Sequence, residues 1–117
     1  MATPIKIGAR SVDDDTAVLS LAGEVDVANA SQVRDAALKL IADGAKHLLV
    51  DLSAIEYMDS TGLGTLVGLH KRLRESGGEV TIAGAKQSVK RLFDITGLMQ
   101  VFRMHEDVSA ALKEVRG

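Results

Sequence analysis

The sequence predicts a single α/β domain whose mixed, mostly parallel sheet has an antiparallel first strand. Apolar and polar residues alternate in the first part of the chain, which is typical of strands, and from residue 29 onward helical periodicity alternates with short apolar runs. Strands that alternate with helices imply right-handed crossovers and parallel pairing. Because 117 residues suffice for one hydrophobic core and not for two, we expect one domain over residues 1–117.

The first two strands should form a hairpin. Apolar residues alternate with polar ones over residues 5–9 and again over residues 17–21. The polar segment SVDDDT, residues 11–16, separates them and predicts a turn. The two strands are therefore expected to pair in antiparallel fashion at one edge of the sheet.

A first helix should begin at Asn29. Asn29 and Gln32 have the spacing of a capping box, and Gly44 suits the end of the helix. The apolar residues that fall on one helical face are Val33, Ala36, Ala37, Leu40 and Ile41.

Three further strand–helix units follow. Residues 47–52 (HLLVDL) are apolar on both faces, as expected of a central strand that helices cover on each side, and residues 79–84 and 100–105 predict two more strands. Helices are expected after each, the second ending near ESGG and the third at Gly97. Their apolar stripes are Leu63, Leu66, Leu69 and Leu73, then Val89, Leu92 and Phe93, then Val108, Ala111, Leu112 and Val115. The predicted order is ββαβαβαβα, with about four helices on the two faces of the sheet.

The composition excludes several classes of protein. Apolar residues make up 46% of the chain with only 3% aromatic residues, so the core should be aliphatic. A net charge of -2 offers no basic field for direct nucleic-acid binding, and there is no cysteine for disulfides or thiolate ligands. The N-terminus lacks the apolar block of a signal peptide, and no run reaches the ~20 apolar residues of a membrane span. We therefore expect a cytoplasmic protein without membrane insertion.

The segment IEYMDSTGLGTL, residues 55–66, joins the central strand to the second helix and has an unusual composition. It places Asp59 before two hydroxyls, Ser60 and Thr61, at the carboxyl edge of the sheet, where ligands and chemistry collect in α/β folds. Asp59 or Ser60 could serve simply as the helix N-cap. The glycines Gly62, Gly64 and Gly68 each cost up to ~1 kcal/mol relative to alanine, which indicates either tight packing on the sheet or close approach of a partner.

No enzyme motif fits this joint. GLGTLVG lacks the G-x-G-x-x-G spacing and begins ten residues after the expected strand end, and GAKQS lacks the adjacent lysine and hydroxyl of a P-loop. Of the three histidines, His70 lies about 15 Å along the helix from Ser60, and His47 starts a strand at the opposite edge. Only His105 could approach, without an orienting partner. Isolated surface histidines explain all three, so we expect no catalytic residue, metal site or cofactor.

A hydroxyl modified by another enzyme is the interpretation that remains. A phosphate on Ser60 would lie at the positive end of the helix dipole, close to free N–H groups, so the fold should tolerate it. It would add about -1.5 to -2 charges beside Asp59, and near Glu24 and Asp26, whose loop also follows a strand. Phosphorylation would therefore alter binding at this edge and leave the fold intact.

Three motifs resemble the anti-sigma factor antagonists of the STAS class. MDSTGLGTL is similar to the D-S-[ST]-G-L signature of that family, LAGEVDVANA to its G-E-[LV]-D loop, and VKRLFDITGL to its third helix. The resemblance covers almost the whole chain, and the length and element order agree with it.

The resemblance implies a bacterial partner switch. The unmodified protein would bind an anti-sigma factor that is also a serine kinase, thereby freeing the sigma factor. That kinase would use ATP to phosphorylate Ser60, in preference to Thr61, and a PP2C-type phosphatase would reverse the modification. The implied switch region consists of Glu24, Asp26, Asp59, Ser60, Thr61, Gly62, Leu63 and Gly64.

Two alternatives stay open at this point. The chain could be a constitutive interaction or scaffold subunit of a larger regulatory or transport complex, with Ser60 serving only as a helix cap. An enzyme or small-molecule binder ranks third. A kinase that modifies Ser60, a partner indifferent to Ser60, or turnover by the isolated chain would distinguish the three.

Overall fold

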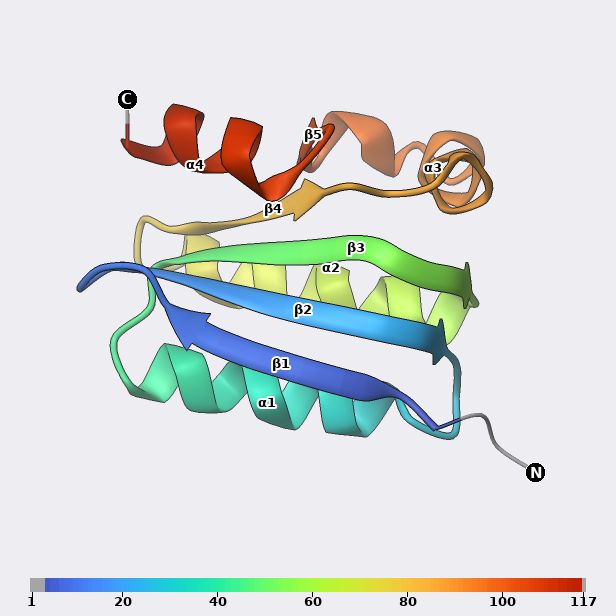
Figure 1. Cartoon of the computed structure of the whole chain (residues 1–117), viewed down its shortest axis with the longest axis horizontal. Helices are drawn as coiled ribbons and strands as arrows, with labels where there is room; N and C mark the ends of the chain where they lie inside the picture. Colours follow the sequence, from blue (N-terminus) through green and yellow to red (C-terminus); the bar gives the residue numbers. More distant parts are fainter. Residues whose placement is uncertain (1–3, 117) are drawn as a thin grey trace.

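A five-stranded mixed sheet with strand order β1-β2-β3-β4-β5 forms the centre of the molecule (Figure 1). The computed structural model describes residues 4–116. The strands are β1 (Lys6–Ser11), β2 (Thr16–Val25), β3 (His47–Met58), β4 (Glu79–Ala83) and β5 (Arg103–His105). β1 pairs antiparallel with β2, and all other neighbours are parallel. The predicted fold class, including the antiparallel edge strand, is confirmed.

Helices cover both faces of this sheet, as predicted. They are α1 (Ala30–Ala42), α2 (Ser60–Arg74), α3 (Gln87–Ile95) and α4 (Val108–Arg116), with a short 3-10 helix η1 (Leu98–Gln100). α1 and α2 lie side by side across one face (Figure 1), where they and α3 contribute to the larger hydrophobic core. On the other face Ala111 of α4 packs with Val18, Leu49 and Ala83. Val115 lies outside the described side chains.

The central strand is longer than the sequence pattern predicted. β3 continues past Leu52 to Met58, which pairs with Val25 at the end of β2. Register shifts between Ser20 and Ala22, and again beyond Gly23, disturb the pairing. Such bulges remove the regular alternation of buried and exposed residues, so the last part of β3 does not resemble a strand in sequence. The joint at Asp59 follows the strand directly. The sequence analysis placed GLGTLVG ten residues after the end of the strand and used this distance as an argument against a dinucleotide site, and that distance was wrong.

The last strand is shorter than predicted. Residues 98–100 form η1, and only Arg103–His105 belong to β5. Phe102, just before β5, is buried and packs edge-on against Phe93, with 5.6 Å between the ring centroids. Residues 100–105, which were predicted as a strand, therefore include Phe102, a core residue that precedes β5.

The helix ends agree with prediction better than the helix starts do. Gly44 and Gly97 adopt positive φ angles of 114° and 76° after the first and third helices, conformations that favour glycine. Asn29 precedes α1 as predicted, but its side chain makes no capping hydrogen bond to the helix. No helix in residues 4–116 is long and apolar enough to span a membrane.

Candidate functional site

Asp59 caps α2 and leaves Ser60 as its first helical residue. The backbone of Asp59 is extended, and its Oδ1 accepts a hydrogen bond from the N–H of Gly62 at 2.9 Å. This is the N-cap geometry that satisfies one of the free N–H groups at a helix start. Among the described residues, no hydrogen bond involves the Ser60 hydroxyl, which is exposed. The cap is therefore provided by Asp59, and the serine hydroxyl is not needed for it.

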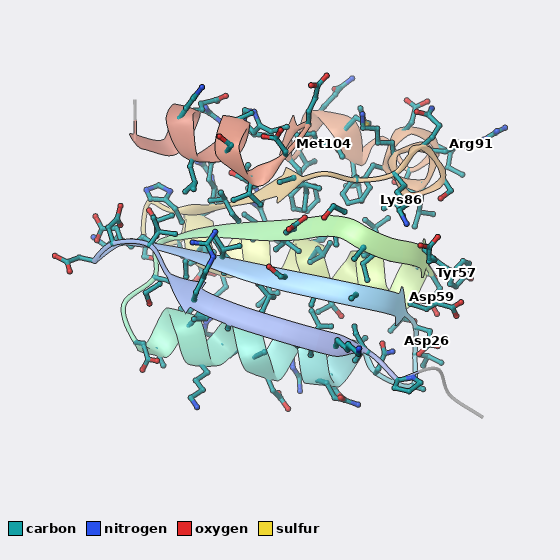
Figure 2. All side chains as sticks on the ribbon, in the orientation of Figure 1. Asp26, Tyr57, Asp59, Lys86, Arg91 and Met104 are labelled. Atoms are coloured by element: carbon teal, nitrogen blue, oxygen red, sulfur yellow. The ribbon has the colours of Figure 1, made fainter. Side chains whose placement is uncertain are left out.

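The second carboxylate oxygen of Asp59 holds the loop that follows β2. Its Oδ2 accepts a hydrogen bond from the N–H of Val27 at 3.1 Å, and its own N–H donates to the carbonyl of Val25 at 3.1 Å. Asp59 thus joins two loops at the carboxyl edge of the sheet. Asp26, Asp59 and Tyr57 consequently lie at the same end of the molecule (Figure 2).

Asn29 fixes the same loop from its other side. Its Oδ1 accepts from the N–H of Asp26 at 3.0 Å, and its Nδ2 donates to the carbonyl of Glu24 at 2.8 Å. This explains why the expected capping box is absent: the amide is engaged by the preceding loop. The buried Asn29 thereby places the partly buried Glu24 and Asp26 next to the joint.

The adjacent hydroxyls Ser60 and Thr61 line different grooves. Thr61 borders a groove of about 490 Å³ between α1 and α2, in which Arg34 and Arg72 are the basic residues. Ser60 borders a groove of about 500 Å³ between the start of α2, the end of β3 and α3. We call these the α1–α2 groove and the α2–α3 groove.

The α2–α3 groove is lined by apolar and polar residues, two of which are acidic. Glu56 is one of them, and it forms an ion pair with Lys86; the other is Asp59, whose two oxygens accept backbone hydrogen bonds. The residues lining the groove are Glu56, Tyr57, Met58, Asp59, Ser60, Ser88, Val89, Arg91, Leu92 and Ile95.

Large apolar side chains are exposed around the serine. Val27 is 76% exposed, Tyr57 52% and Ile95 72%, and these three come from the loop after β2, from β3 and from α3. Scattered single exposures are normal on protein surfaces, but several at one edge are typical of interaction surfaces. The combination of an accessible hydroxyl and exposed apolar residues fits a docking edge better than a catalytic cleft.

The three glycines of α2 have different surroundings. Gly62 is buried, and a Cβ there would lie 2.7 Å from Cγ1 of Val25. Gly64 and Gly68 are exposed and line the α1–α2 groove, and a Cβ at either would meet nothing within 4 Å. Leu63 is buried in the core as well, so Gly62 and Leu63 support the joint from within, whereas Gly64 lies on the surface.

The histidines lie away from Ser60, and the description of all three as surface residues was wrong for His70. His70 is buried, and its Nδ1 accepts a hydrogen bond from the N–H of Val80 at 3.1 Å. Burial is the largest influence and lowers the pKa of His70. No histidine lines the α2–α3 groove in the described structure.

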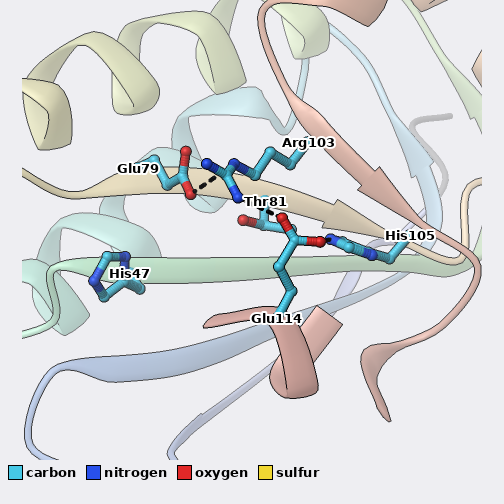
Figure 3. Close-up of a pocket in the computed structure, with 6 residues that line it drawn as sticks. All are labelled: His47, Glu79, Thr81, Arg103, His105 and Glu114. Atoms are coloured by element: carbon cyan, nitrogen blue, oxygen red, sulfur yellow. Dashed lines mark hydrogen bonds and ion pairs between the residues drawn. The ribbon is translucent and has the colours of Figure 1, made fainter. Parts of the chain in front are cut away.

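His47 and His105 belong to a second polar cluster that the sequence analysis missed (Figure 3). It surrounds a pocket of about 150 Å³ that is lined by His47, Glu79, Thr81, Arg103, His105 and Glu114. Nε2 of His105 lies 3.0 Å from Oε2 of Glu114, and Arg103 contacts both Glu114 and Glu79. The hydrogen bond to Glu114, followed by the charge of Glu79, raises the pKa of Arg103. These contacts join α4 to the short strand β5.

Among the described residues, neither the acidic side chains that line the α2–α3 groove nor this polar cluster is arranged as a metal centre. Within residues 4–116, no group of three or more histidine, cysteine, aspartate or glutamate side chains is arranged to hold a metal ion. The alternation of Arg103 and His105 along β5 places both on one face of the strand, which is the only sequence signal for the second cluster.

A model of the STAS domain matches residues 9–111 of the sequence. The chain belongs to the STAS domain family. It is 37% identical over 106 residues to an anti-sigma-B factor antagonist of Bacillus subtilis, covering 91% of this chain and 92% of that protein. The resemblance read from the three sequence motifs is thereby confirmed.

Solved structures agree with this assignment. An anti-sigma factor antagonist from Mycobacterium paratuberculosis superposes with a TM-score of 0.87 and 29% identity, covering 97% of this STAS chain and 96% of that one. The Bacillus cell fate determinant SpoIIAA in its phosphorylated form gives a TM-score of 0.76 at 21% identity, covering 94% and 99%, which is a likeness of fold alone.

Proposed function

We propose that this STAS domain is an anti-sigma factor antagonist that acts as a partner switch controlled by phosphorylation of Ser60. Unphosphorylated, it binds an anti-sigma factor that is also a serine kinase and so frees the sigma factor. The kinase uses ATP to phosphorylate Ser60 and is released, and a PP2C-type phosphatase restores the active form. The exchange takes place in the cytoplasm, and residues 1–117 form the single STAS domain that binds these partners.

The observation that carries this proposal is the division of labour between Asp59 and Ser60. Asp59 makes the capping hydrogen bond and fastens the loop after β2, while the Ser60 hydroxyl is exposed and has no hydrogen-bond partner among the described residues. A serine retained only as a cap would be expected to make that bond itself. This supports the switch over the scaffold alternative.

Electrostatics at the joint supports release by phosphorylation. Asp26 and Asp59 lie at the edge that carries Ser60 (Figure 2), so a phosphate of about -1.5 to -2 charges would concentrate negative charge there. The helix dipole and the free N–H groups at the start of α2 favour an anion at this position, which keeps the domain folded. A docked partner would meet new bulk and new charge, whereas the hydrophobic core would be unchanged.

The test is intact-mass spectrometry with site mapping on the purified chain, incubated with ATP and each candidate anti-sigma factor kinase from its own genome. We expect a gain of one phosphate, located on Ser60. Ser60→Ala should bind the same kinase and remain bound when ATP is added, because it offers no acceptor.

Thr61→Ala is the matched control, since it removes the neighbouring hydroxyl that lines the other groove. It should be phosphorylated and released as the unchanged chain is. Phosphate on Ser60→Ala at full stoichiometry would show that the acceptor is another residue. A stable kinase complex that ATP does not modify at all would return the scaffold alternative to first place.

A further inference from the structure

The α2–α3 groove brings together two residues that are distant in sequence. Ser60 belongs to the first turn of α2 and Arg91 to α3, and both line the groove. Ser88, Arg91, Leu92 and Ile95 follow the i, i+3, i+4, i+7 spacing of one helical face. Arg91 therefore belongs to the residues of α3 that border the groove.

Arg91 is the one basic side chain among the residues that line this groove in the described structure. The nearby Lys86 forms an ion pair with Glu56, so its charge is already matched. Arg91 is exposed, and no ion pair or hydrogen bond of its side chain occurs within residues 4–116. The groove is thus bordered by an unmatched guanidinium from α3 and by the serine hydroxyl from α2.

We propose that Arg91 binds the phosphate of phosphorylated Ser60, so that the phosphoserine spans the groove from α2 to α3. The ligand class is a phosphomonoester dianion, and this inference rests on the proposed function for the identity of the acceptor. A guanidinium presents two parallel N–H donors that match phosphate oxygens. Because the phosphate is covalently attached to Ser60 of the same chain, its effective concentration near Arg91 is high.

This pairing would change the docking edge in two ways. The phosphate would occupy the groove between Tyr57 and Ile95, whose exposed side chains belong to the docking edge. It would also neutralise the one cation on the groove wall, which a partner's carboxylate could otherwise bind. The partner would then be released because the phosphate fills the groove, in addition to the repulsion between negative charges that Asp26 and Asp59 strengthen.

The experiment uses the full chain with phosphoserine incorporated at position 60 by genetic encoding, so it needs no kinase. ³¹P NMR follows the second ionisation of the phosphate, which lies at about pH 6 in an unpaired phosphoserine. A nearby cation favours the dianion and lowers that midpoint. Arg91→Gln should therefore raise the midpoint by roughly 0.5 pH unit. Arg10→Gln on β1 makes the same charge change away from the groove and should leave the midpoint in place.

A second readout follows the arginine itself. The ¹⁵Nε–¹H signal of Arg91 should shift when phosphoserine replaces serine at position 60, and it should shift back on treatment with phosphatase. A midpoint that is the same in Arg91→Gln as in the unchanged phosphoprotein would overturn the proposal. So would a midpoint that rises in Lys86→Gln and not in Arg91→Gln, because the phosphate would then bind the other cation. The kinase assay reports separately whether Ser60 is the acceptor, so the two hypotheses can fail independently.

Discussion

The two ends of helix α2 have opposite characters. At its start Ser60, Thr61 and Gly64 are exposed and border two grooves. At its end Leu69 and Leu73 are buried, and His70 is bonded to the backbone of β4. The same helix therefore presents a surface for exchange at the carboxyl edge of the sheet and anchors the fold further along. This arrangement allows one end to change its charge while the other keeps the helix in place.

The C-terminal end of α2 is fixed by contacts with the core and with the next strand. The ring of His70 lies 5.1 Å from that of Phe102, which joins it to the core next to β5. The N–H of Gly78 donates to the carbonyl of Leu73 at 2.9 Å, which closes the helix end against the next strand. Changes at this end should alter stability and leave partner binding in place, whereas a change of Ser60 at the exposed start should alter partner binding and leave the fold intact.

Gly62 lies at the start of α2, but its substitution should lower the stability of the fold, and this is the largest effect that we expect. A side chain there meets Val25 at 2.7 Å and Met58 at 3.0 Å. Because both are buried, Gly62→Val should lower the free energy of unfolding by about 1–3 kcal/mol through overpacking. Denaturant unfolding followed by circular dichroism measures this.

The matched control is Gly64→Val, the same substitution two residues further on, where a Cβ meets nothing within 4 Å. Its stability should stay close to that of the unchanged chain. Equal losses at the two positions would mean that the helix start tolerates no side chain for a reason other than contact with β2 and β3.

Sequence reasoning recovered the element order because each change of hydrophobic period is local. It failed where tertiary pairing decides the outcome. The tail of β3 is a strand because β2 pairs with it as far as Met58, and the bulges hide that from the pattern. His70 sits in the polar stretch HKRLRE and looks exposed, yet its ring is buried by contacts with β4 and Phe102.

The candidate site shows the same division. The sequence located Asp59 and Ser60 at the joint, since an acid and a hydroxyl before a helical stripe form a local signal. It did not indicate Arg91, because nothing near α3 in sequence says that this helix borders the groove of Ser60. Nor did it separate Ser60 from Thr61 by surroundings, since only the packing of α1 and α3 beside α2 assigns them to different grooves.

The second prediction concerns the anchored end and pH. The pKa of His70 is lowered chiefly by burial, with the charge of Glu79 opposing and that of Arg74 adding to the effect. The unfolded chain, with a histidine pKa near 6.5, therefore binds a proton more readily than the folded one. Stability from His70 is fully present above pH 6.5 and is lost as the pH falls through the lowered pKa of the folded state.

Protonation would also remove the lone pair on Nδ1 that accepts the N–H of Val80, a hydrogen bond contributing on the order of 1 kcal/mol. Unfolding free energies at pH 8 and pH 5, compared between the unchanged chain and His70→Phe, isolate this contribution. The variant should be less stable at pH 8 and should lose less on acidification. An identical pH dependence in both would assign the acid sensitivity to other groups.

The smallest expected effect tests which groove the partner uses. Gly64→Ala adds a methyl group at an exposed position of α2 where a Cβ meets nothing, so it should stabilise the chain by up to about 1 kcal/mol through helix propensity. Gly64 lines the α1–α2 groove, whereas the proposed docking edge follows the α2–α3 groove. We therefore expect higher stability with unchanged affinity for the kinase, measured by calorimetric titration. A clear loss of affinity would mean that a partner approaches the backbone at Gly64. The start of α2 would then contact partners through both the α1–α2 groove and the α2–α3 groove.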